Sequence, residues 1–408
     1  MTNKVPNIRF KGFTDDWEQR KAGEIFKSVS DKGYIDLPVL SASQELGMIL
    51  RDEIGIDIKY DESSIKNYKR VKPGQFVIHL RSFQGGFAWS DIEGITSPAY
   101  TILDYQEPEE HCSKFWKIVL TSPMFITRLE TVTYGIRDGR SISFTDFSTL
   151  NLNVPSIAEQ QKIGEYFSNL DHLITLHQRK CEQAKELKKF MLQKIFPKKG
   201  EKNPEIRFPG FTDDWEQRKL GEVGIAKSGV GFPDTEQGGV EGIPFFKVSD
   251  MNIKGNENEL VAANNYVTVE QVSRKKWNVI NDVPAIFFAK VGAAVMLNRK
   301  RLVRFPFLLD NNTMAYVFNK NVWDCDFGKT LFETLDLTKL TQVGALPSYN
   351  ASDVENIRIN IPNKGEQQKV GEYFSNLDRL ITLHQREVFY TLKHIFYRCC
   401  DTLLSGGL

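Results

Sequence analysis

The chain has 408 residues, which is enough for two or three domains with hydrophobic cores of their own. Its five cysteines are odd in number and include no C-x-x-C pair, which argues against a disulfide framework and against a zinc site. No apolar run reaches the length of a membrane span, and the polar opening MTNKVPNIRF does not resemble a signal peptide. We therefore expect a cytoplasmic protein that binds no metal.

The net charge is only +1 at pH 7, with 53 basic and 52 acidic residues. Residues 25–155 carry a net charge of −3 and residues 223–362 a net charge of 0. Binding driven by bulk positive charge is therefore excluded. Any contact with a polyanion has to use local patches or a partner.

In chain order, the first feature is a repeat. Residues 9–24 and 207–222 are identical at 14 of 16 positions, and residues 159–179 and 366–386 at 19 of 21. The stretches between these blocks, 25–142 and 223–349, show little similarity. We expect the near-identical blocks to bind one kind of partner twice about an approximate two-fold axis, and the divergent stretches to bind two different things. Uniform drift after duplication would not give this contrast.

The first divergent stretch predicts strands at 74–80, 99–105 and 149–155, and a helix over 113–131 that breaks near Pro123. A long amphipathic helix follows over 156–196, opened by a capping-box pattern at Ser156 and Glu159. At about 1.5 Å per residue it would span roughly 60 Å, which suits a strut.

The second divergent stretch predicts strands at 243–248, 284–291, 313–318 and 357–362. It leads to a second long helix, which repeats the capping pattern at Asn363 and Glu366. We align Ala99-Tyr100 with Ala315-Tyr316 and infer one fold for both stretches. The two long helices are expected to pack antiparallel, with surplus apolar surface for partner helices.

Four residues inside the predicted helices need explanation. Gly164 and Gly371 are compatible either with a close helix–helix approach or with a frayed first turn. His177 and His384 lie in the apolar seam, and we interpret them as core or interface histidines because no second ligand stands at metal spacing.

This arrangement resembles the specificity subunits of type I restriction–modification systems over essentially the whole chain. The resemblance rests on the W-x-x-x-K/R-x-G-E segments Trp17–Glu24 and Trp215–Glu222, on the variable cassettes, and on the EQQK segments that open the helices. The fold it implies is α/β (α+β), with two pseudo-symmetric target-recognition domains separated by a pair of long antiparallel helices. The expected parts are an opening repeat with the first recognition domain (1–155), a central helix (156–200), a second repeat with the second recognition domain (201–362) and a distal helix (363–408).

The resemblance also implies a function without catalysis in this chain. Each recognition domain would read one half of a gapped, bipartite site in double-stranded DNA. The helices would dock two methyltransferase (modification) subunits and, through them, two restriction/translocase subunits. The chain itself would hold no cofactor, whereas the complex would use S-adenosylmethionine, and ATP and Mg²⁺ for restriction.

Base edges are read by Arg, Lys, Asn, Gln or Ser on loops that approach the groove. The predicted DNA-binding residues are Arg81, Ser82, Gln84, Arg137, Arg140, Ser141, Lys227, Ser228, Lys247, Lys290, Asn298, Arg299, Lys300, Arg301 and Ser348. The predicted partner-binding residues, on the helix seams, are Ile163, Phe167, Leu170, Ile174, Val370, Phe374, Leu377 and Ile381.

The alternative is a self-contained DNA methyltransferase or endonuclease. Residues 96–100 (TSPAY) only partly match the N/D-P-P-Y/F loop that an amino-methyltransferase needs. Residues 233–238 (PDTEQG) lack the lysine of a nuclease motif. One departure from the family pattern is the segment 387–408, which loses the basic character of 180–202, where eight lysines face three glutamates.

Overall fold

The computed structural model describes residues 6, 8–43, 46–54, 62–78, 87–132, 142–341 and 346–402. It divides into two compact units. Unit 1 comprises Met1–Gln178 with Arg386–Leu408, and unit 2 comprises Arg179–Gln385. The boundary falls inside both long helices, so each helix contributes one part to each unit. Each unit has hydrophobic clusters of its own.

Unit 1 contains an antiparallel four-stranded sheet in the order β2-β9-β6-β7, an antiparallel pair β1–β10, and two smaller pairs, β3–β4 and β5–β8. Its strands are β1 (Glu18–Lys21), β2 (Phe26–Val29), β3 (Leu40–Ser43), β4 (Gly47–Leu50), β5 (Lys69–Val71), β6 (Phe76–Ile78), β7 (Ala88–Trp89), β8 (Gly94–Thr96), β9 (Thr101–Tyr105) and β10 (Asn151–Val154). Its short helices are α1 (Ala22–Ile25), α2 (Ser113–Leu120), α3 (Pro123–Leu129) and α4 (Phe144–Ser148). The three predicted strands are confirmed. The predicted break is also confirmed, because Ser122 caps α3 and Pro123 is its first residue.

Unit 2 contains a sheet in the order β12-β18-β15-β16, the pair β11–β19, and a three-stranded sheet β14-β13-β17. Its strands are β11 (Glu216–Lys219), β12 (Gly224–Ser228), β13 (Ile243–Phe246), β14 (Tyr266–Val267), β15 (Ala285–Ala289), β16 (Lys300–Val303), β17 (Leu308–Leu309), β18 (Thr313–Phe318) and β19 (Arg358–Ile361). Its short helices are α6 (Leu220–Val223), α7 (Val269–Lys275), α8 (Cys325–Thr334) and α9 (Ala351–Glu355). All four predicted strands are confirmed.

The four-stranded sheets of the two units have the same strand order, so the expectation of one shared fold is confirmed. The detailed alignment is wrong at one place. Phe26 pairs with Tyr105, and its repeat equivalent Gly224 pairs with Phe318. This register puts Leu103, and not Tyr100, at the position of Tyr316. A two-letter match could not detect the shift, because strand register is set by the pairing partner.

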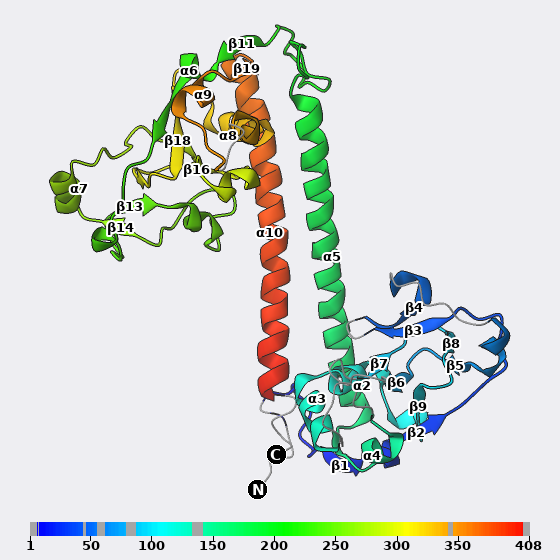
Figure 1. Cartoon of the computed structure of the whole chain (residues 1–408). Helices are drawn as coiled ribbons and strands as arrows, with labels where there is room; N and C mark the ends of the chain where they lie inside the picture. The colour runs from blue at the N-terminus through cyan, green and yellow to red at the C-terminus, as the bar shows by residue number, and fades with distance from the viewer. Residues whose placement is uncertain are drawn as a thin grey trace. The chain divides into compact units, whose positions relative to one another are not determined.

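The two long helices are α5 (Ile157–Ile195) and α10 (Lys364–Thr402), each of 39 residues. Within unit 2, the second part of α5 lies antiparallel beside the first part of α10 (Figure 1). Cys181 Sγ lies 3.9 Å from the carbonyl of Ile381, and the rings of Phe196 and Phe374 lie 6.3 Å apart. The predicted antiparallel pairing is therefore confirmed. Within the described residues, no helix combines the length and the apolar character that crossing a membrane requires.

Candidate nucleic-acid and partner interfaces

The repeated blocks form the same ion pair in both units. The Arg9 guanidinium donates from Nε and Nη2 to the two Glu159 oxygens, at 2.6 and 2.7 Å. Arg207 makes the same two contacts with Glu366, at 2.7 and 2.8 Å. Both glutamate side chains are 1% exposed. These hydrogen bonds raise the pKa of both arginines.

This ion pair corrects the predicted capping boxes. Ser156 Oγ accepts the backbone N–H of Glu159 at 3.4 Å, so half of the first box forms. The glutamate carboxylate, however, binds Arg9 from the first repeat block and does not return to the helix start. Asn363 and Glu366 behave in the same way. The glutamate of EQQK therefore joins block 9–24 to block 159–179 in unit 1, and block 207–222 to block 366–386 in unit 2.

The first glutamine of EQQK attaches the long helix to the cassette. Gln160 Nε2 donates to the carbonyls of Pro155 and Glu110, at 3.0 and 3.1 Å, and its Oε1 accepts the N–H of Cys112 at 2.9 Å. Gln367 repeats this pattern with Pro362, Val322 and Asp324. Both glutamines are 1% exposed, so water cannot reach their side-chain amides. These hydrogen bonds therefore satisfy polar groups that would otherwise be buried without a partner.

The two helix glycines allow a close approach, which settles the alternative left open by the sequence. A Cβ on Gly164 would lie 2.8 Å from Lys114 Cβ at the start of α2. A Cβ on Gly371 would lie 2.6 Å from the backbone nitrogen of Phe327 in α8. Arg9, Arg207, Gln160 and Gln367 were not singled out from the sequence. Their recurrence in both repeat blocks was the available signal.

Six of the predicted DNA-binding residues lie outside the described residues: Arg81, Ser82, Gln84, Arg137, Arg140 and Ser141. The other nine lie in unit 2, and the side chains of three of these, Asn298, Lys300 and Arg301, hydrogen-bond to backbone groups of their own unit. Asn298 bonds to the backbone of Leu335 and Leu337. Lys300 Nζ donates to Asn298 Oδ1 at 2.8 Å, and burial lowers the pKa of Lys300 to about 8. Arg301 Nε donates to the carbonyl of Asn256 at 2.6 Å.

The remaining predicted residues of unit 2 are spread over several edges of the sheets. Lys227 lies on β12, 3.9 Å from Asp282, and Ser228 is exposed at the end of that strand. Lys247 donates to Gln237 Oε1 at 3.2 Å. Lys290 and Ser348 are half-buried where the segment after β15 meets residues 346–349. Arg299 Nη1 donates to Asn252 Oδ1 at 2.7 Å.

The predicted partner-binding residues divide by burial. Ile163 and Phe167 are buried in the core of unit 1, and Val370, Phe374 and Leu377 in that of unit 2. A side chain that is buried in its own unit offers no surface to another subunit. Leu170, Ile174 and Ile381 are half-buried.

The same helices expose other leucines at equivalent positions of the repeat. Leu173 and Leu176 are 42% and 36% exposed, and Leu380 and Leu383 are 45% and 48% exposed. We call these four residues the leucine pairs. The near-identical repeat therefore presents the same partly exposed apolar pair once in each unit.

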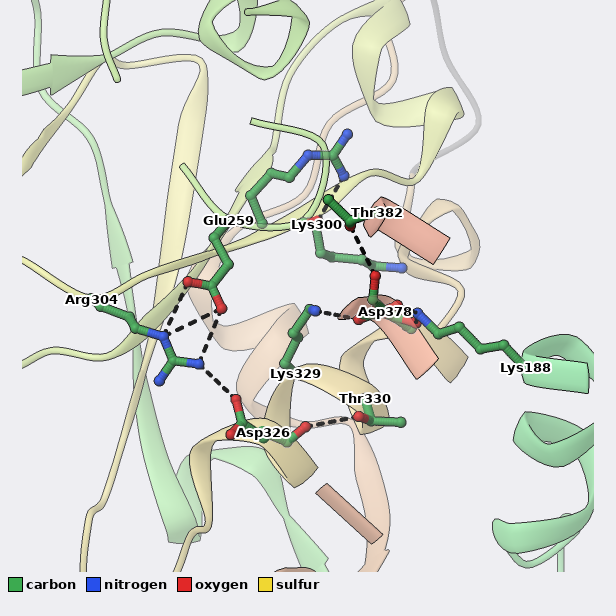
Figure 2. A network of polar contacts seen from close by, with 11 residues as sticks. Lys188, Glu259, Lys300, Arg304, Asp326, Lys329, Thr330, Asp378 and Thr382 are labelled. Carbon is green, nitrogen blue, oxygen red and sulfur yellow. Dashed lines mark hydrogen bonds and ion pairs between the residues drawn. The ribbon is translucent and has the colours of Figure 1, made fainter. Parts of the chain in front are cut away.

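Unit 2 also holds a charged cluster where α5, α8 and α10 meet. Lys188 Nζ lies 2.6 Å from Asp378 Oδ1, and Lys329 Nζ lies 2.5 Å from Asp378 Oδ2 (Figure 2). Lys188 Nζ also lies 2.6 Å from Glu333 Oε2. Burial by itself would raise the pKa of Asp378, but the charges of Lys329 and Lys188 outweigh it and hold that pKa below its ordinary value.

The equivalent contact in unit 1, between Lys117 and Asp171, is longer at 3.5 Å and is exposed. The repeat register places Ile395 where α5 has Lys188. In the described part of the chain, no three His, Cys, Asp or Glu side chains gather as metal ligands would.

Comparisons with known proteins identify the family of this chain. A family model for the type I restriction modification DNA specificity domain matches residues 120–186 and 212–388. These residues are more than half of the chain, and the chain therefore belongs to this family.

One relative is the specificity subunit of the type I restriction enzyme MjaVIII of Methanocaldococcus jannaschii, 25% identical over 269 residues. The match covers 59% of this chain and 58% of that relative, so the chain spans little more than half of the relative's length. The S subunit of a type I restriction–modification system from M. genitalium has a similar structure, with a TM-score of 0.61 at 14% identity over 98% of both chains. A second structure, from a study of complex assembly in a type I system, has a TM-score of 0.51 at 13% identity, over 95% of this chain and 97% of the other. At such identities the likeness concerns the fold.

Proposed function

We propose that each variable cassette of this specificity subunit reads one half of a gapped, bipartite site in double-stranded DNA. One observation carries the proposal: two different cassettes are fastened by the same contacts. The Arg–Glu pairs and the glutamine bonds repeat atom for atom. The smaller sheets of the cassettes differ, because unit 1 has two separate pairs whereas unit 2 has a three-stranded sheet with a parallel pair. Two cassettes that are attached in the same way but differ in their smaller sheets suit the recognition of two different DNA sequences.

The repeated leucine pairs support a partner of one kind bound twice. We propose that each pair docks one methyltransferase subunit, and that restriction subunits join through these. Their exposure of 36% to 48% leaves apolar surface that such a contact would bury. The complex would draw on S-adenosylmethionine for methylation, and on ATP and Mg²⁺ for restriction, at sites outside this chain.

Sequencing the methylated motifs of cells that carry this chain with its methyltransferase partner tests the DNA-reading role. Replacing residues 223–349 by the second cassette of a related subunit should change one half of the motif and leave the other half intact. Exchanging the blocks 9–24 and 207–222, which differ at two positions, is the matched control and should change nothing. A motif that survives the cassette exchange unaltered contradicts the proposal.

The docking role is tested by the stoichiometry of the purified complex, measured by native mass spectrometry. The variant Leu380→Ser with Leu383→Ser should retain one methyltransferase subunit of two. The variant Leu187→Ser is the control, because Leu187 is 44% exposed on α5 but belongs to neither pair. Two bound copies in both variants would refute docking at the leucine pairs. Methylation of DNA by the purified chain alone, given S-adenosylmethionine, would favour a self-contained methyltransferase instead.

A further inference from the structure

The segment that joins β15 to β16 lies in a basic part of a cassette whose net charge is 0. Residues 283–309 contain five Lys and Arg residues and no Asp or Glu. Residues 223–362 as a whole have a net charge of 0. Among the described residues, Arg304 pairs with Glu259 and Asp326, whereas Lys290 and Arg299 lie in no ion pair and can attract a polyanion.

The turn itself has a fixed base and an apolar tip. At one end, the N–H of Gly292 donates to the carbonyl of Pro347 at 2.9 Å. At the other end, Asn298 adopts a left-handed conformation with φ of 50°, which its side-chain bonds to the 335–337 backbone hold in place. Between these ends, Val295 is buried, whereas Met296 and Leu297 are 57% and 61% exposed. Two adjacent exposed apolar side chains on a fixed turn suit a contact surface.

Arg299 is the last residue of the turn and has a donor left over. Its Nη1 is oriented by Asn252 Oδ1 at 2.7 Å. No described residue accepts a hydrogen bond from its Nη2, and its Nε is buried without a partner. The neighbouring Lys300 and Arg301 bind backbone carbonyls of their own unit. Arg299 therefore keeps its Nη2 for an outside acceptor, and the bond to Asn252 fixes the direction of the guanidinium.

We propose that this turn, residues 292–299, is a base-reading element of the second cassette. Arg299 donates to the edge of a guanine, which has the two major-groove acceptors that a guanidinium matches best. Met296 and Leu297 make apolar contact with the neighbouring base, such as a thymine methyl group. Asn252 is a positioning residue, since it acts through Arg299. This inference rests on the proposed DNA-reading function and adds the element and the chemistry of its contact.

The test uses the full chain in its complex with the methyltransferase subunits and a library of randomised duplexes, with the bound fraction sequenced. The variant Arg299→Ala should lower the preference for guanine at one position of the second half-site by about tenfold and leave the other positions unchanged. Asn252→Ala should weaken the preference at that same position, and Arg299→Lys should not restore it. Arg218→Ala is the control, because Arg218 lies on β11 outside the cassette and pairs with Glu222.

Unchanged preferences in Arg299→Ala, or an equal loss for every sequence, would overturn the inference. Should Arg299→Ala fail to fold, the double change of Met296 and Leu297 to Ser decides, because both side chains are already more than half exposed. It should lower the preference at the neighbouring position, and an unaltered profile would overturn the inference. The exchange of residues 223–349 separates the two proposals. If the exchange changes the motif but these variants do not, the inference fails alone; if the exchange changes nothing, the DNA-reading function fails.

Discussion

Removing Arg207 should destabilise unit 2 far more than removing an ordinary surface arginine. Glu366 is 1% exposed, and among the described residues its carboxylate binds only Arg207. The change Arg207→Met would leave a buried charge without a partner. The free energy of unfolding should fall by about 3 kcal/mol, the lower end of the range for breaking a buried pair, because the guanidinium is itself 15% exposed. Arg207 also donates to the carbonyl of Asp213 at 2.5 Å, and this bond is lost as well.

The assay is urea unfolding of the full chain, followed by tryptophan fluorescence and circular dichroism. Arg218→Met is the matched control, since the partners of Arg218 among the described residues are the exposed Glu216 and Glu222, and the change should cost less than about 1 kcal/mol. Adding Glu366→Gln to Arg207→Met should recover much of the loss, because it removes the unpaired charge. A loss below 1 kcal/mol for Arg207→Met, or a double variant as unstable as the single one, would refute the reasoning.

Three further predictions concern packing, the charged cluster and pH. Gly371→Ala should destabilise unit 2 by about 2 kcal/mol despite better helix propensity, since its Cβ would lie 2.6 Å from the Phe327 nitrogen. Gly365→Ala is the control and should not destabilise it, because the nearest atom to its Cβ would lie 3.4 Å away. Equal melting temperatures of the two variants would contradict this prediction. Lys188→Met should cost about 2 kcal/mol in urea unfolding, because Asp378 keeps only Lys329, and a cost no larger than that of the exposed control Lys185→Met would count against the cluster. Burial lowers the pKa of His111 to about 4 in the folded chain, so the unfolded chain binds the extra proton first. The free energy of unfolding should therefore fall as pH drops from about 6.5 to 4. The variant His111→Asn should flatten this pH dependence in thermal melts, and an unchanged slope would exclude His111 as its source.

The contact that Lys188 makes could not be predicted from the repeat alone. Lys188 joins α5 to α10 within unit 2, and the equivalent position of the repeat in the sequence is Ile395. The sequence showed that the segment after Arg386 diverges. It could not show that Lys188 binds Asp378, because that contact joins residues 190 positions apart.

The prediction of partner-binding residues from the sequence did not anticipate which side chains are buried in their own unit. Ile163, Phe167 and Val370 follow the helical spacing of a seam, but each fills the core of its own unit. Leu187 follows the same spacing and is 44% exposed. Periodicity identifies an apolar face, but it does not say which neighbour covers that face. The same limit applies to the adjacent basic residues Arg299 and Lys300. Lys300 binds a backbone carbonyl of its own unit, whereas Arg299 binds Asn252 through Nη1 and keeps Nη2 for another acceptor.

The sequence by itself determined that this protein has two divergent cassettes of one fold and two long helices. It could do so because a near-identical block must form the same local contacts wherever it recurs, and because strand and helix periods are local properties. Only the tertiary structure decided that Glu159 and Glu366 bind arginines about 150 residues away, that Gly164 and Gly371 admit neighbouring helices, and that the leucine pairs stay exposed. Each of these depends on the packing of distant segments against one another, which no local pattern encodes.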